Sequence, residues 1–180
     1  MEKVLFILFS TVLSTSLYAQ EDIELNNPKH EIKLNMTNII AFKWFDVGYE
    51  YILNEESSIG VGTLISLDPN DNTGLDEYRT FSLTPYYRHF FSRKYAQGFF
   101  VEAFTMLHSG KEDIYYDNID DSYKVEGNYT DLAIGVSAGG KFITKRGFIA
   151  EIYLGLGRDM LGQSDIEVVG RGGIALGFRF

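Results

Sequence analysis

Hydrophobic and polar positions alternate with a period of two along most of the chain beyond residue 30. In the segment 43–53, for example, Phe45, Val47 and Tyr49 are separated by single polar or glycine residues. Successive side chains of a β-strand point to opposite faces, so this pattern predicts strands with one apolar face and one small or charged face. The alternation between turn signals predicts eight strands, over residues 31–41, 43–53, 58–67, 78–91, 98–109, 128–142, 147–158 and 170–180.

The last predicted strand, GRGGIALGFRF, shows the alternation most clearly. One of its faces carries the apolar residues Ile174, Leu176, Phe178 and Phe180, and the other carries small or cationic residues. A lipocalin, which is a soluble eight-stranded barrel, needs the opposite polarity, with an apolar interior. The pattern therefore predicts an all-β fold, an eight-stranded antiparallel up-and-down transmembrane barrel over residues 31–180, with a side-chain-filled interior.

The polar faces of the predicted strands carry charges of both signs. Sorting these charges by strand parity places ten of them inside the barrel, namely Lys33, Arg88, Lys141, Arg171 and Arg179 with Asp46, Glu50, Glu102, Asp131 and Glu151. The interior of an eight-stranded barrel is just wide enough for side chains, and buried charges persist only when they are paired. We predict ion pairs that close the core. A narrow channel for small solutes is the alternative.

Two segments repeat each other, GFFVEAF at 98–104 and GFIAEIY at 147–153. Each carries an inward glutamate, and the strand before each carries an inward cation. This hairpin-level repetition predicts two matching pairs, Arg88 with Glu102 and Lys141 with Glu151.

The first nineteen residues have the features of a secretory signal, with Lys3 before an apolar run and Ala19 at the exit. The apolar run is too short to span a bilayer. We expect a cleavable signal peptide over residues 1–19 and a periplasmic lead-in over 20–30. The chain has no cysteine, which excludes disulfides and thiolate metal sites. We predict no metal and no cofactor.

The net charge of −9 is unevenly distributed along the chain. Acidic residues concentrate in the long predicted loops near 68–77, 110–127 and 159–169, whereas basic residues occupy short turns near 92–97 and 143–147. Outer-membrane barrels have long outside loops and short periplasmic turns. We therefore expect an acidic outer surface and periplasmic termini, and the acidity argues against nucleic acid as a partner.

The loop predicted at 110–127 mixes acids with tyrosines. Tyrosine gives contact area at a low entropy cost, and barrels carry functional residues on long loops. This loop is a candidate surface for an extracellular partner, through Tyr115, Tyr116, Asp120, Asp121 and Tyr123. The alternative is a solvated loop that only extends its two strands.

With paired inner charges, short basic turns, acidic loops and the terminal GIALGFRF, the chain resembles the small eight-stranded outer-membrane β-barrel proteins of Gram-negative bacteria. OmpA-like and OmpX-like barrels and an outer-membrane barrel family of unknown function are the nearest kin. The resemblance implies contact with outer-membrane lipid and lipopolysaccharide, and a structural or surface-interaction role in the envelope. It also implies an assembly signal read by the barrel assembly machinery, in which Gly172 is smaller than usual and the matching residues are Ile174, Leu176, Phe178 and Phe180.

Two features could carry other chemistry. His108 and Ser109 could serve a lipid-modifying or lipid-binding barrel enzyme, but neighbouring strand residues point to opposite faces, so we expect no catalysis. The loop from Asp68 is rich in oxygen ligands like a calcium loop, yet Arg79 stands where a bidentate glutamate should close the site. We expect a solvated turn there.

Overall fold

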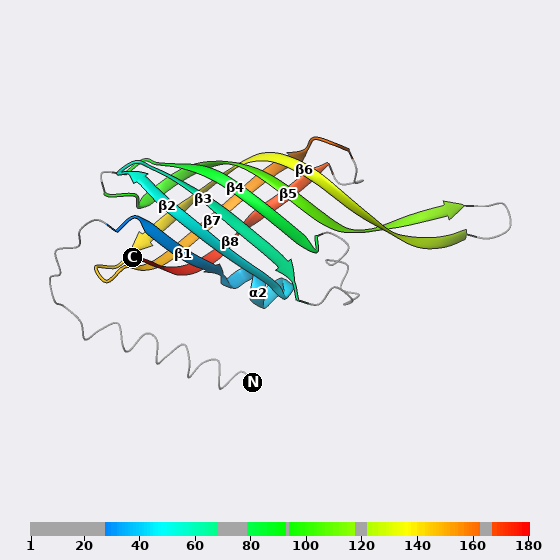
Figure 1. Ribbon diagram of the computed structural model, residues 1–180, viewed down its shortest axis with the longest axis horizontal. Helices are drawn as coiled ribbons and strands as arrows, with labels where there is room; N and C mark the ends of the chain where they lie inside the picture. Colours follow the sequence, from blue (N-terminus) through cyan, green and yellow to red (C-terminus); the bar gives the residue numbers. More distant parts are fainter. Residues whose placement is uncertain (1–27, 68–78, 93, 118–121, 163–166) are drawn as a thin grey trace, which may run out of the picture.

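The computed structural model describes residues 28–67, 79–92, 94–117, 122–162 and 167–180, with the backbone alone described between 112 and 126. Its eight strands form a closed antiparallel barrel in which each strand pairs with its neighbours in the sequence and the last returns to the first (Figure 1). The predicted fold class is thereby confirmed. The strands are β1 His30–Asn35, β2 Trp44–Asn54, β3 Ser57–Ser66, β4 Phe81–Phe90, β5 Gly98–Asp117, β6 Ser122–Ile143, β7 Phe148–Asp159 and β8 Val168–Arg179, and one helix, α2 Met36–Phe42, follows β1.

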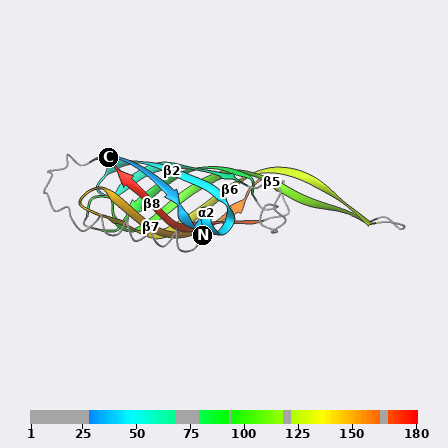
Figure 2. The ribbon, with the colours of Figure 1, turned by 90° about the horizontal axis from the view of Figure 1, so that it is seen from below.

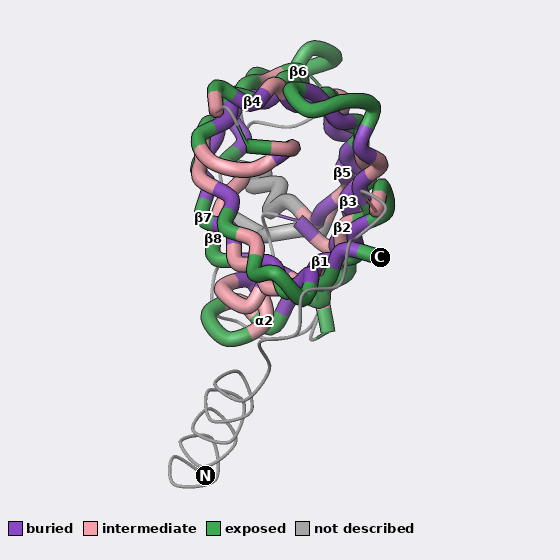
Figure 3. The backbone as a smooth tube through the Cα atoms, turned by 90° about the vertical axis from the view of Figure 1, so that its left-hand side faces the viewer, coloured by how far each residue is buried: buried purple, intermediate pink, exposed green. Residues whose placement is uncertain are grey.

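Buried and exposed residues alternate along the barrel wall, as Figure 3 shows in purple and green. On β6, Asp131, Ala133 and Ser137 are buried while Ile134 and Val136 are exposed. The outer face is apolar and the inner face holds charged, hydroxyl and aromatic side chains. A barrel in water would need the reverse polarity, so this exterior suits lipid.

Residues 36–42 form a helix where the alternation predicted that the first strand continues to residue 41. The Asn35 side chain causes the change because its Oδ1 accepts a hydrogen bond from the backbone N–H of Asn38 at 3.2 Å, which caps the helix. At the other end Lys43 adopts a φ of 53°, and its N–H donates to the Asn38 carbonyl. The first strand is therefore shorter than predicted.

The segment predicted as the loop 110–127 is mostly strand. β5 and β6 stay paired from Gly110 opposite Tyr129 to Asp117 opposite Ser122. They form a two-stranded hairpin that extends well beyond the other strands (Figures 1 and 2). Of the two predictions for this segment, the one in which it extends its two strands thus describes the backbone.

Short connections and the chain's C-terminal end lie together at the opposite end of the barrel from this hairpin (Figure 1). In the turn between β6 and β7, Gly147 has a φ of 86°, and its carbonyl accepts a hydrogen bond from the Arg179 N–H at 2.8 Å. A side chain at this position would collide with the Arg179 carbonyl. The predicted signal peptide, nearly all of the predicted lead-in and the calcium-like loop lie outside the described residues.

Within the described ranges, the structure contains no helix of the length and apolar character that crossing a membrane requires.

Candidate functional site

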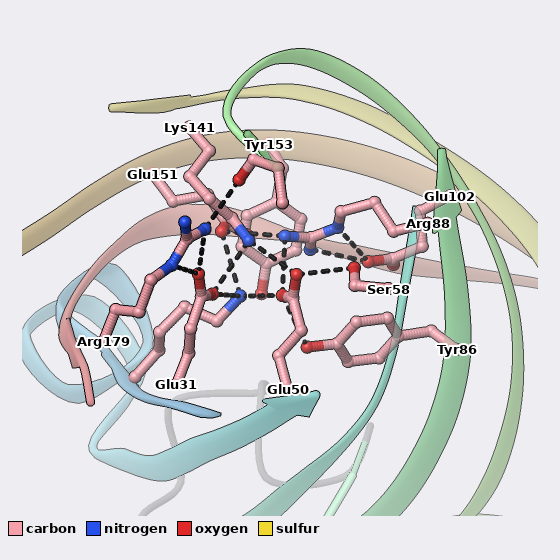
Figure 4. Close-up of polar contacts among 12 residues, drawn as sticks. Glu31, Glu50, Ser58, Tyr86, Arg88, Glu102, Lys141, Glu151, Tyr153 and Arg179 are labelled. Atoms are coloured by element: carbon pink, nitrogen blue, oxygen red, sulfur yellow. Dashed lines mark hydrogen bonds and ion pairs between the residues drawn. The ribbon is translucent and has the colours of Figure 1, made fainter. Parts of the chain in front are cut away.

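Charged side chains from seven strands meet inside the barrel and bind one another (Figure 4). All but one are less than a tenth exposed, and Arg171 is 13% exposed. Each member is joined to another by at least one ion pair. The network contains five cations and four glutamates, namely Lys33, Arg88, Lys141, Arg171 and Arg179 with Glu31, Glu50, Glu102 and Glu151.

Glu50 on β2 lies at the centre of the network. Its carboxylate binds three cations and two hydroxyls, namely Lys33, Arg88 at 3.0 Å, Lys141 at 2.5 Å, Ser58 Oγ at 2.6 Å and Tyr86 Oη at 3.2 Å. A buried carboxylate is stable only when such donors replace its lost water. Glu50 is fully buried, and these five contacts replace the water that its carboxylate loses.

Arg88 on β4 connects three of the four glutamates. Its Nη2 lies 2.7 Å from Glu102, and its Nη1 lies 2.8 Å from Glu151 and 3.0 Å from Glu50. The guanidinium also lies 3.8 Å from the centre of the Phe100 ring, a cation–π contact. A planar cation that binds several carboxylates fixes their relative positions across the lumen.

Of the two hairpin pairs that the repeat predicted, the structure shows one. Arg88 faces Glu102 across β4 and β5 and binds it. Lys141 faces Glu151 in register but binds Glu31 at 2.8 Å and Glu50 instead. The register thus places Lys141 opposite Glu151 as predicted, while Oε2 of Glu151 binds Lys33 and Arg88.

Two of the predicted inner acids lie apart from the network. Asp46 accepts hydrogen bonds from the side-chain amides of Asn35 at 3.1 Å and Asn38 at 2.7 Å. Asp131 accepts from the backbone N–H groups of Leu132 at 2.7 Å and Leu161 at 3.0 Å. Amides therefore provide the described contacts of these two carboxylates.

His108 and Ser109 point to opposite faces of β5, as adjacent strand residues must. The His108 ring is buried and its Nε2 lies 2.8 Å from Asp159 Oδ1. Ser109 Oγ lies 2.9 Å from Thr130 Oγ1 at the exposed surface. The serine and the imidazole therefore do not share a site.

A model of the family described as "Protein of unknown function (DUF3575)" matches residues 4–169. The chain belongs to this family. The crystal structure of the N-terminal β-barrel domain of Pseudomonas aeruginosa OprF is similar, with 14% identity, a TM-score of 0.56 and coverage of 86% of this chain and 98% of that one. The resemblance to small OmpA-like barrels is thus confirmed at the level of the fold. No curated protein matches the chain.

Sequence reasoning missed two charged residues in this DUF3575 barrel. Glu31 is buried and binds Arg179 at 2.6 Å, although it lies at the predicted boundary of the first strand. The strand alternation could have identified it, because Glu31 lies two residues before Lys33 and therefore on the same inward face. Arg79 is buried near the other end of the barrel, next to a segment that the sequence assigned to loop.

The remaining candidate residues lie outside this network. On β8 and after it, Ile174, Phe178 and Phe180 are exposed on the outer face and Leu176 is half-buried. Five residues were predicted to bind an extracellular partner. Tyr115, Tyr116 and Tyr123 belong to the two strands of the hairpin, while Asp120 and Asp121 lie outside the described residues. In the described part of the chain, no three His, Asp or Glu side chains are grouped so that they could hold a metal ion.

Proposed function

We propose that this DUF3575 barrel is an outer-membrane protein of a Gram-negative envelope, with a structural or surface-interaction role and without an open pore. The observation that carries the proposal is the ion-pair network across the lumen. Glu50 and Arg88 together join side chains from opposite parts of the wall, so a solute would have to break several buried ion pairs to pass.

The exterior supports the membrane location. Val136, Leu154 and Leu156 are each more than three-fifths exposed, on the same face of neighbouring strands. A soluble monomer rarely exposes such a continuous apolar surface. In this proposal outer-membrane lipid and lipopolysaccharide surround the wall, and the barrel assembly machinery reads the outer face of β8 through Ile174, Leu176, Phe178 and Phe180.

The long β5–β6 hairpin supports a surface role, because it extends away from the barrel end that holds the C-terminus (Figure 1). We place the hairpin outside the cell and the termini in the periplasm. The acids and tyrosines of the segment 111–126 would then meet an extracellular partner.

Vesicles containing the refolded mature chain should show no stable single-channel openings in a planar bilayer at moderate voltage. The physical reason is the buried network, because an ion would have to separate several of its ion pairs to cross the lumen. A porin added to the same membrane serves as the positive control. Large, stable openings by the DUF3575 barrel would overturn the closed-core proposal.

The same vesicles test the proposed lack of catalysis. When they contain lipopolysaccharide, we expect no release of acyl chains over hours. Release that is lost in His108→Ala but kept in His89→Ala would contradict a non-enzymatic role. His89 is the control because it lies opposite Val101, further along the β4–β5 pair from the Ser82–His108 position.

Protease added to intact cells should cleave the hairpin near residues 111–126 and leave a barrel that still migrates faster without heating on gels. Recovery of this band from outer-membrane fractions would support the location. Cleavage only after the outer membrane is permeabilised would place the hairpin on the periplasmic side and overturn the orientation.

A further inference from the structure

The β5–β6 hairpin has two edges that the rest of the barrel does not cover. β4 pairs with β5 only as far as Phe81 opposite Ser109, and β7 pairs with β6 only from Ala133 opposite Asp159. Beyond these points β5 and β6 pair with each other, and none of the other described strands joins them (Figure 2). A strand edge of this kind presents a row of backbone N–H and C=O groups to which another strand can bind.

The register determines which residues of β6 direct their backbone groups to its free edge. The Leu132 carbonyl accepts a hydrogen bond from the Met160 N–H at 2.9 Å, on the side where β7 lies. Alternate residues of an antiparallel strand bind on the same side, and the β5–β6 register runs unshifted to Asp117 opposite Ser122. The residues whose backbone groups face the free edge are therefore Ser122, Lys124, Glu126 and Asn128.

The two edges of the hairpin differ in charge. The segment 111–117 of β5 carries three acids and one lysine, which is an excess of negative charge. The segment 122–128 of β6 carries one lysine, Lys124, and one acid, Glu126, and is neutral overall. Opposite charges that face each other stabilise a strand pair, and like charges destabilise it. The β6 edge can therefore bind a second copy of itself, whereas two β5 edges would repel each other.

One antiparallel register of two β6 edges is self-complementary. When Val125 faces Val125 of a second copy, Lys124 faces Glu126 in both directions. Ser122 and Asn128 face each other in the same register. A shift by two residues either way instead places Glu126 opposite Glu126 or Lys124 opposite Lys124. A parallel pair around a two-fold axis places every residue opposite its own copy, so both like-charge contacts form there. Charge thus selects the antiparallel register centred on Val125.

We propose that the hairpin binds the hairpin of a second copy of this chain, edge to edge along β6, in the register centred on Val125. Hairpins that project from one membrane point the same way, so antiparallel pairing joins copies in two facing membranes. This contact rests on the outside location of the hairpin in the proposed function, and its extracellular partner is the same protein on a neighbouring cell. Many short contacts between two cell surfaces together bind far more strongly than one.

Cysteine cross-linking tests the register, because the chain has no cysteine of its own. The backbone groups of Val125 face β5, so the two copies of this residue form a non-hydrogen-bonded pair with Cα atoms about 4.5 Å apart, which a disulfide can span. The mature chain with Val125→Cys, refolded in phosphatidylcholine vesicles, should form a disulfide-linked dimer under mild oxidation. Ile114→Cys is the matched control and should stay monomeric, because Ile114 lies opposite Val125 on β5, away from the proposed contact.

Charge reversal tests whether the contact joins two membranes. Vesicles that carry the wild type should cluster, as measured by light scattering. Vesicles with Lys124→Glu alone or Glu126→Lys alone should not cluster, since each variant places like charges opposite each other. A mixture of these two kinds of vesicle should cluster again, because glutamates on one side then face lysines on the other. Lys94→Glu, in an exposed turn at the other end of the barrel, makes the same change of net charge and should leave clustering intact.

Absence of the Val125→Cys dimer, a dimer of Ile114→Cys in its place, or no recovery of clustering in the mixture would overturn the proposal. Faster migration on unheated gels, measured on every sample, shows whether each barrel has folded. The vesicle experiments do not depend on the location of the hairpin in the cell, which the protease experiment measures separately. A folded barrel whose hairpin lies outside the cell but does not pair loses only this contact, and the envelope role stands.

Discussion

Glu50→Gln should destabilise the barrel by about 3–5 kcal/mol, which is the usual cost of leaving buried charges without their partner. Glu50 is the carboxylate that Lys33, Arg88 and Lys141 share. Ser58 and Tyr86 donate to different oxygens of the carboxylate, so the single amide oxygen can still accept from one of them. The substitution removes the charge and leaves the side-chain volume nearly unchanged. Three buried cations then lie close together with less compensation.

The measurement is the free energy of unfolding from urea titrations of the barrel refolded in lipid. Glu55→Gln is the matched control, because it makes the same chemical change in the exposed turn after β2, and it should alter stability by less than about 0.5 kcal/mol. A loss below about 1 kcal/mol in Glu50→Gln would show that the network carries little of the stability. Adding Lys141→Met should restore part of the loss, since it removes one of the stranded cations.

The alternation in the sequence was enough to place side chains on the correct face of the wall. Arg88 and Glu102 were predicted to face inward, and the register places them directly opposite each other. The choice of partner was not predictable from the pattern, because long inward side chains reach across a narrow lumen. Lys33 and Glu151 bind each other although 118 residues separate them in the sequence.

The elements that sequence reasoning misplaced each depend on a local contact. The run 36–42 is apolar enough for a strand, but the Asn35 cap and the hydrogen bond from its side-chain amide to the Gly172 carbonyl favour a helix at this position. The hairpin between 110 and 127 carries many charges, which suggested a loop. Cross-strand backbone bonds keep it in strand form far beyond the barrel.

The two halves of the barrel interior are therefore filled differently. The half near the C-terminal end is filled by ion pairs and by the packed rings of Phe90 and Phe100. The half nearer the hairpin has a helix in place of a strand, and a cavity of about 480 Å³ lies there beside Phe42, Trp44 and Met106. The ion-pair network borders the cavity through Arg171 and reaches the C-terminal end of the barrel through Arg179.

Gly177→Val should prevent stable closure of the barrel, with a loss of about 3 kcal/mol or failure to fold. Closure depends on five residue pairs between β1 and β8, and Gly177 lies in the middle pair, opposite Lys33. A Cβ at Gly177 would lie 2.2 Å from the Ile32 carbonyl oxygen and 2.7 Å from Lys33 Cγ. Since the obstacle includes backbone, β8 would have to move away from β1.

The other neighbour of Lys33 provides the control. Gly48 on β2 pairs with Lys33 from the opposite side, and a Cβ there comes no closer than 4.0 Å to any atom outside its own chain neighbours. Gly48→Val should therefore fold and migrate faster on unheated gels, like the wild type, while Gly177→Val should not. Equal folding of both variants in lipid vesicles would show that the β1–β8 seam tolerates a side chain, and that closure does not require the close approach of the two strands at Gly177.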